Sequence, residues 1–345
     1  MKGLGNHAII LLVQKERIHW IDIARGIGII FVIYAHVLGS HDFRYLFYAF
    51  HMPFFFFLSG ILHKNSDNFM DYLRKSAKRL LVPYLTIAVL TYLLWFFNLK
   101  NHSLSPEVIR QFLGIFYGNS NNGLLAFNNI LWFLPTLFAT RIIFALITKV
   151  SEKIKVLILK LFLFSIAGYF LSIFMPNVKL PFGIEIALSA VVFYGTGFLW
   201  QKSNRAKEFV SGYKYFLFPV LLILGSIAAT IDFNNYGHQI DMRLGHLNNY
   251  FLFYIGAFSG IFAWIAFSII LKKNLLLEII GKNALILFAW HPIVFIYLGK
   301  FLKIFADSGA IEIIRKYIPL LYTAISISII LFVNSIIKKL RSACH

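Results

Sequence analysis

Cysteine is almost missing from this chain: its 345 residues include one, Cys344, next to the C-terminus. A single cysteine excludes an internal disulfide and any metal site built from several cysteines. The HExxH, Walker, GxSxG and GxGxxG patterns that carry metal, nucleotide or hydrolase chemistry are missing as well. We therefore expect no metal site, and the chemistry has to be sought in other residues.

Acidic residues are also scarce, with 14 Asp and Glu against 33 Lys and Arg and a net charge of +19. Such a charge can indicate a nucleic-acid partner. Here, however, the basic residues lie in short clusters between apolar runs, and 59% of the chain is hydrophobic. This pattern is typical of the cytoplasmic loops of membrane proteins. We therefore expect contact with membrane lipids and no nucleic-acid binding.

Apolar stretches of membrane-spanning length recur along the whole chain, since a bilayer core needs about 20 apolar residues. They cover about residues 20–39, 45–62, 80–98, 130–148, 156–175, 183–200, 213–231, 250–271, 280–299 and 317–337. We predict an all-α, polytopic integral membrane protein with about ten transmembrane helices. An even number of spans places both termini on one side of the membrane.

The orientation follows from the basic residues. Most of those outside the spans lie on the side of the termini, as in the cluster RKSAKR at 74–79. The positive-inside rule then makes both termini cytoplasmic. Residues 1–19 read as a cytoplasmic extension, because the run AIILLV is too short for a signal peptide, and residues 20–340 form the transmembrane domain. For the location we expect the cell inner (cytoplasmic) membrane, crossed many times.

The first span, WIDIARGIGIIFVIYAHVLG, contains three ionisable residues: Asp22, Arg25 and His36. Each Arg or Asp inside such a span costs roughly 2.5–3.5 kcal/mol on insertion scales, which favours a functional role. Eleven helical steps place His36 on nearly the same face as Arg25, about 16 Å further along the axis. Asp22 falls on that side too.

Two interpretations of this face remain open. In the first, Asp22 and Arg25 form a buried ion pair near the inner surface and His36 is an ordinary core residue. In the second, Arg25 binds a cytosolic polyanion while His36 acts deeper in the membrane. An imidazole suits a general base because its unperturbed pKa of about 6.5 is close to neutral pH.

Four further stretches combine polar groups with apolar spans. HMPFFFFLSG contains His51 and Ser59, and its proline predicts a kink. RKSAKRLLVPYL is a topology signal, a phosphate-binding site, or both. LWFLPTLF contains Trp132, and Arg141 follows the end of this motif by about one helical turn. GKNALILFAWHP contains His291, directly before its final proline. The segments 99–129 and 232–249 form outer loops, whose Asn, His and Asp side chains either bind sugars or are simply hydrated.

Together these stretches resemble the integral-membrane acyltransferase 3 family, and most closely its fucose 4-O-acetylase-like branch. The motifs that carry the resemblance are WIDIARGIGIIFVIYAH, HMPFFFFLSG, KRLLVPY, WFLPTLF and GKNALILFAWHP, in that order. The Arg, ten residues, His arrangement of the first span is the most specific of them. Members of the family have about ten helices and transfer an acyl group, usually acetyl from acetyl-CoA, to extracytoplasmic sugars.

The resemblance implies that His36 is the catalytic residue and that Arg25 helps to hold the coenzyme. It also implies a basic coenzyme site around Arg79. Many relatives have a second Arg three residues before this one, where the present chain has Ser76. Lys75 and Lys78 are the candidates to replace it.

We therefore expect an acyl-CoA-dependent O-acyltransferase that uses acetyl-CoA as donor and a surface glycan or its lipid-linked precursor as acceptor. The site residues fall into three groups. The catalytic group is His36, Arg25 and Asp22; the coenzyme group is Arg25, Arg79, Lys78, Lys75 and Ser59; the acceptor group is His51, Trp132 and His291. The main alternative is a transporter or flippase for a glycolipid or polysaccharide precursor, which shares broken helices and intramembrane charges. A glycosyltransferase is disfavoured because the first outer loop has no pair of acidic residues.

Overall fold

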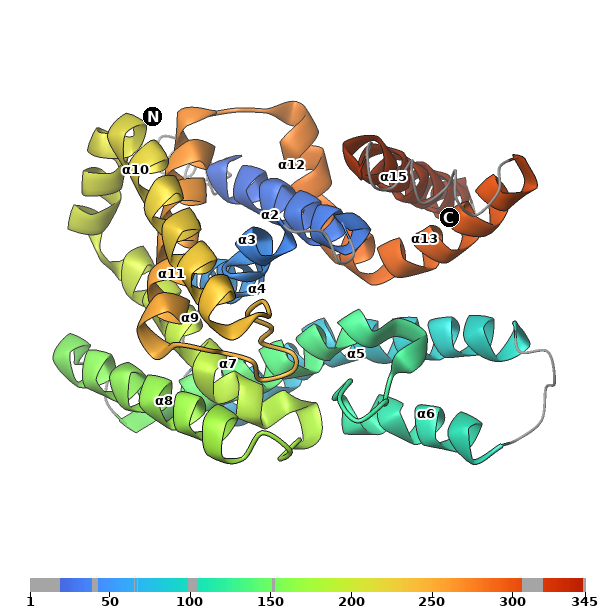
Figure 1. The fold of residues 1–345 in the computed structure, drawn as a ribbon, viewed down its shortest axis with the longest axis horizontal. Coiled ribbons are helices and arrows are strands. Elements are labelled where there is room, and N and C mark those ends of the chain that lie inside the picture. The colour runs from blue at the N-terminus through green and yellow to red at the C-terminus, as the bar shows by residue number, and fades with distance from the viewer. Residues whose placement is uncertain are drawn as a thin grey trace, which may run out of the picture.

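A computed structural model describes residues 19–38, 43–64, 66, 68–98, 105–150, 153–305 and 319–343. These residues form helices and connecting turns, without a strand, as Figure 1 shows. The α-helices are α2 (His19–Leu38), α3 (Arg44–Tyr48), α4 (His51–Ile61), α5 (Phe69–Phe97), α6 (Pro106–Tyr117), α7 (Phe133–Val150), α8 (Ile154–Phe174), α9 (Ile184–Lys202), α10 (Asn204–Tyr236), α11 (Tyr250–Ile270), α12 (Leu275–Lys282), α13 (Ala284–Phe305) and α15 (Pro319–Ala343). Two 3₁₀ segments, η1 (Ala126–Trp132) and η2 (Pro181–Gly183), lead into α7 and α9.

Nine helices in the described part of the chain are long and apolar enough to cross a membrane. They coincide with nine of the ten predicted spans, so the chain is an all-α polytopic membrane protein. Of the predicted extension 1–19, only His19 lies within the described residues, where it begins α2.

The one predicted span without such a helix, 45–62, is broken into the short helices α3 and α4. The expectation of one kinked helix is therefore wrong in detail. The break follows from Pro53, whose ring clashes with the carbonyl four residues earlier in a continuous helix and so stops α3 before Ala49. Phe50 leaves the helical conformation, with a φ of −136°. Pro53 then sits in the first turn of α4, where proline is tolerated.

Two helices extend beyond the sequence prediction. α5 begins at Phe69, well before the predicted start at 80, because the Asn68 side chain caps the backbone N–H groups of Met70 and Asp71. α6 lies inside the segment predicted as an outer loop. It is started by Ser105 as N-cap and a proline in its first turn. Both starts are local cap signals that hydropathy does not detect.

Glycines let the central helices approach closely. In Figure 1, α2, α3 and α4 lie in the middle, between α11 on one side and α12 and α13 on the other. A Cβ at Gly60 of α4 would overlap the backbone oxygen of Tyr194 in α9. A Cβ at Gly281 of α12 would overlap the backbone oxygen of Asp22 in α2. Small residues at such crossings are what helix packing in membranes requires.

Candidate active site

The polar face of α2 is formed as the sequence predicts. Arg25 Nη1 lies 3.4 Å from Asp22 Oδ1, so the two side chains form an ion pair. Asp22 is buried and Arg25 is half-buried. His36 lies three helical turns further along, about 16 Å away along the axis. The helix therefore carries a cation at one end and an imidazole near the other.

The His36 ring is held by its own helix. Its Nδ1 lies 2.7 Å from the backbone oxygen of Val32. A carbonyl oxygen can only accept, so Nδ1 carries the proton and donates this hydrogen bond. The neutral ring then has a free lone pair on Nε2, which is the form that a general base requires.

His36 lines an open pocket with about 610 Å³ of space not filled by atoms, part of which is continuous with solvent. Its walls come from α2, α3, α4, the η1 segment, α13 and the outer loop that follows α10. The lining residues are Val32, His36, Arg44, Tyr48, His51, Met52, Asn129, Ile130, Trp132, Asp241, Met242, Arg243 and Phe288. In the predicted orientation this pocket faces the extracytoplasmic side, because the outer loop forms part of it.

Two of the three predicted acceptor residues, His51 and Trp132, line this pocket together with His36. His51 Nδ1 donates to the backbone oxygen of Phe47 at 2.7 Å, an arrangement like that of His36. Tyr48 lies between the two imidazoles, with its ring centroid 6.2 Å from His36 and 4.8 Å from His51. Residues far apart in the sequence thus meet around one imidazole.

The third predicted acceptor residue, His291, lies beside His36 but is fully buried and is not part of the pocket wall. The two ring centroids are 5.1 Å apart. His291 Nδ1 donates to the backbone oxygen of Phe288 at 2.8 Å, and its Nε2 is buried without a hydrogen-bond partner. Its position suits contact with His36 rather than direct contact with an acceptor in the open pocket.

Two pocket residues, Arg44 and Tyr48, were missed by the sequence reasoning. The Arg44 guanidinium lies 4.4 Å from the centroid of the Tyr48 ring and donates a hydrogen bond to its hydroxyl. The four-residue spacing of a cation and a tyrosine at the outer end of a span is the signal that could have indicated them. Together with Arg243, Arg44 gives this wall of the pocket two guanidinium groups.

The outer loop 237–249 contributes Asp241, Met242 and Arg243 to the pocket wall. Arg243 Nη2 lies 3.6 Å from Asp241 Oδ2, and both side chains line the pocket. Asp241 also pairs with His246 through backbone hydrogen bonds in both directions. Burial, with a further contribution from His238, lowers the pKa of His246 below its usual 6.5. The His246 side chain is exposed, and its lowered pKa favours the neutral state of the ring.

The asparagine-rich segment 118–123 anchors this loop. Asn121 donates to the backbone oxygen of Arg243 at 2.8 Å, and Asn119 donates to Glu185 Oε1 at 2.7 Å. Both asparagines are buried. Their amides therefore stabilise the fold of the outer surface, whereas only sugar binding or hydration was considered for them from the sequence.

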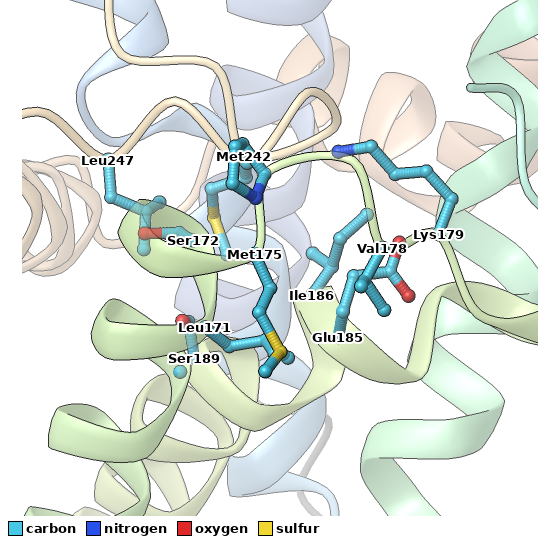
Figure 2. Close-up of a pocket in the computed structure, with 13 residues that line it drawn as sticks. Leu171, Ser172, Met175, Val178, Lys179, Glu185, Ile186, Ser189, Met242 and Leu247 are labelled. Atoms are coloured by element: carbon cyan, nitrogen blue, oxygen red, sulfur yellow. The ribbon is translucent and has the colours of Figure 1, made fainter. Parts of the chain in front are cut away.

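A second pocket, with about 370 Å³ of space not filled by atoms, is lined by residues of α8, α9 and the outer loop (Figure 2). Met242 lines both pockets. Lys179 extends to the loop, where its Nζ donates to the backbone oxygen of Leu244 at 2.9 Å. Burial lowers the pKa of Lys179, while the nearby Glu185 acts in the opposite direction. This pocket is mainly apolar and adjoins the His36 pocket through a single side chain.

The predicted coenzyme residues lie near the other end of α2, and the structure brings only some of them together. Arg79 is exposed on α5, and its charge acts on Arg25. Lys75 and Lys78 are also exposed on α5, and Ser59 is half-buried on α4. None of these three side chains forms a hydrogen bond or ion pair with Arg25. Among the predicted coenzyme residues of α5, Arg79 is the one whose charge acts on Arg25.

Aromatic rings occupy the space between the two ends of α2. Gly28, one turn beyond Arg25, lies against the ring of Phe55. The Phe55 ring contacts that of Phe133, with centroids 6.1 Å apart, and Phe133 contacts Phe288 at 5.5 Å. Phe288 lines the His36 pocket. A row of three rings thus separates the level of Arg25 from the level of His36.

Comparison with known proteins gives one match. A family model described as an acyltransferase domain matches residues 18–338, which is nearly the whole chain. Neither the curated proteins nor the solved structures give a significant match.

Proposed function

The chain belongs to this acyltransferase family and is a membrane acyltransferase, and from that premise we propose that it transfers an acetyl or similar short acyl group from acyl-CoA to a sugar hydroxyl. The acceptor is an extracytoplasmic surface glycan or its lipid-linked precursor, as in the fucose 4-O-acetylase-like branch that the sequence resembles. The protein works in the cell inner membrane, with acetyl-CoA arriving from the cytosol. The family match favours this reaction over the transport of a glycolipid.

The donor end of the reaction is the end of α2 that carries Arg25. Coenzyme A is a large polyanion, which a bilayer excludes, whereas its pantetheine arm is long and thin. Arg25 and Arg79 supply the positive charge that phosphate groups require. Lys75, Lys78 and Ser59 border the same end of the molecule and extend this site. Asp22 acts as a positioning residue, because its ion pair fixes the Arg25 side chain.

The observation that carries the proposal is the state of His36 in its pocket. With Nδ1–H bonded to Val32, the free lone pair on Nε2 removes the proton from an acceptor hydroxyl. The hydroxyl oxygen then attacks the carbonyl carbon of the thioester. When the C–S bond breaks, the thiolate of coenzyme A leaves and takes the proton back from the imidazolium. The products are an ester and free coenzyme A, and no other reactant is needed.

The acceptor end is the His36 pocket. Tyr48 and Trp132 offer ring faces on which a sugar can stack, and His51 offers a hydrogen-bonding group. The two arginines of the outer wall add charge-assisted donors for polar groups of the acceptor. The buried His291 ring packs against His36 and helps to hold its position.

The proposal is tested by the release of free coenzyme A from acetyl-CoA by the purified protein with a glycan fraction from the envelope of its host. We expect His36→Ala to lose turnover by at least about a hundredfold, the scale of a general base, while its affinity for coenzyme A stays unchanged. The matched control is His238→Ala, which removes an exposed histidine of the outer loop outside the pocket wall. Undiminished turnover in His36→Ala would contradict the assigned role, and no release by the unaltered protein would contradict the reaction.

A further inference from the structure

A buried polar cluster lies where the ends of α4, α5, α7 and α9 meet. His63, just after α4, places its Nδ1 2.9 Å from the Tyr194 hydroxyl and 3.3 Å from the Tyr72 hydroxyl. The rings of Phe144 and Phe198 pack edge-on against the imidazole. Polar groups buried among aromatic rings are stable when their hydrogen bonds are complete, so atoms without partners in this cluster need a reason.

Two polar atoms of this cluster have no partner. Arg141, on α7, places its guanidinium 5.4 Å from the centroid of the Tyr72 ring, and its buried Nε has no hydrogen bond. Ser76 follows Tyr72 by one turn on α5, is 1% exposed, and its Oγ has no hydrogen bond either. Leaving such groups unpaired is costly. Both donors adjoin the same tyrosine, and neither has a hydrogen-bond partner within the described residues.

The charge of this region is also uncompensated. Arg79, one turn beyond Ser76, and Arg141 both act electrostatically on the Tyr194 hydroxyl, and Arg79 also acts on Arg25. Within the described residues, the only one of these three arginines in an ion pair is Arg25, with Asp22. Arg141 is half-buried and Arg79 is exposed, and with no described carboxylate paired to either guanidinium the two can bind an anion from outside the protein.

We propose that Arg141 is a phosphate-binding residue of the coenzyme site, and that it completes a group of three arginines with Arg25 and Arg79. This inference rests on the proposed function and extends it to a residue from another helix. The Arg141 fork binds phosphate oxygens in bidentate fashion, while the Tyr72 ring holds its plane. The Ser76 hydroxyl donates a further hydrogen bond to the same phosphate.

The role of position 76 follows from this geometry. Under this proposal, the guanidinium of Arg141 on α7 replaces the arginine that many relatives have at the position of Ser76 on α5. The phosphate ligand is therefore bound between two helices, rather than by successive residues of one helix. In addition, α7 follows directly on Trp132, which lines the His36 pocket. One continuous segment thus contributes to both ends of the reaction path.

Calorimetric titration of the purified full-length protein in lipid nanodiscs tests this role. The ligands are coenzyme A, adenosine 3′,5′-bisphosphate and pantetheine, of which only the first two carry phosphates. For Arg141→Ala we expect an affinity for coenzyme A lower by about tenfold to a hundredfold, the loss of a charge-assisted hydrogen bond. Arg141→Lys keeps the charge and loses less, and Ser76→Ala loses about threefold to tenfold. Binding of the bisphosphate falls in parallel.

The control is Arg205→Ala, which removes an exposed arginine of the first turn of α10 on the same predicted side of the membrane. Equal losses in Arg205→Ala and Arg141→Ala would show a general charge effect and overturn the inference. Unchanged affinity in all three variants of Arg141 and Ser76, while the unaltered protein binds coenzyme A, would overturn the inference alone. If the unaltered protein binds no coenzyme A, the proposed donor and the inference both fail. If Arg141→Ala does not fold, the coenzyme A affinities of Arg141→Lys and Ser76→Ala decide the test.

Discussion

At the scale of single residues, three histidines share one local arrangement and differ in their surroundings. His36, His51 and His291 each donate from Nδ1 to a backbone oxygen three or four residues earlier. His36 is the half-exposed member of the three, and the other two are buried. The same helix bond therefore orients each ring, and His36, the most exposed of the three, is the one proposed as the general base.

Arg25 gives a prediction at this scale. Arg25→Ala removes the guanidinium beside Asp22, and a coenzyme phosphate then loses a charge-assisted hydrogen bond. We expect the affinity for coenzyme A to fall by about tenfold to a hundredfold, as measured by calorimetry. Arg25→Lys, which keeps the charge, should lose less. An affinity equal to that of the unaltered protein would show that Arg25 serves only the ion pair.

The sequence predicts local relations between residues and misses those that depend on the fold. The pair Asp22 and Arg25 is three residues apart, so helix geometry alone predicts its contact, which the structure confirms. Arg141 and Tyr72 come from separate helices, and no spacing rule connects them. The sequence also gives no sign that Asp241 and Arg243 line the His36 pocket, because the outer loop reaches this pocket only through tertiary packing.

At the scale of helices, the contact between α2 and α12 fixes the position of the Arg25 end. Gly281 of α12 faces the backbone of Asp22, and Gly26 of α2 faces the backbone of Leu277. The predicted span 280–299 begins in the last turn of α12 and runs into α13, and no separate helix was predicted at 275–282. The start of α12 follows from the cap at Asn274, whose side chain accepts from the backbone N–H of Leu277 at 3.0 Å, and the helix ends at Lys282.

Gly281→Ala is the corresponding prediction. The added Cβ would overlap the backbone oxygen of Asp22, so the two helices must separate. We expect a loss of about 1–3 kcal/mol, the usual cost of overpacking, seen as a lower melting temperature in detergent. Gly212→Ala is the control, because no atom lies within 4 Å of its Cβ. That change should leave the melting temperature equal or slightly higher. Equal effects of the two changes would contradict the close packing of α2 and α12.

At the scale of the whole molecule, hydropathy predicts the all-α membrane fold because long apolar helices are a property of composition and length. It predicts neither the break between α3 and α4 nor helix α6, since these depend on one proline and on local caps. The orientation of the chain in the membrane is predicted separately, from the distribution of Lys and Arg, and it remains a prediction.

The single cysteine makes that orientation easy to test. Cys344→Ser gives a cysteine-free background, into which His238→Cys or Asn204→Cys is introduced at exposed positions. We expect a membrane-impermeant maleimide to label the His238→Cys protein from outside, once any outer layers of the envelope are opened. The Asn204→Cys protein should react only after the membrane is disrupted. The reverse labelling pattern would contradict the predicted orientation and would mean that the His36 pocket faces the cytosol.

The row of rings formed by Phe55, Phe133 and Phe288 bears on the ion permeability of the membrane. A passage through the membrane for a long thioester would also conduct protons and sodium ions if it stayed wet. Aromatic side chains in mutual contact offer hydrated ions no replacement for their water shell. If the proposed path for the thioester runs between these rings, we expect the protein without a bound donor to leave the membrane potential intact.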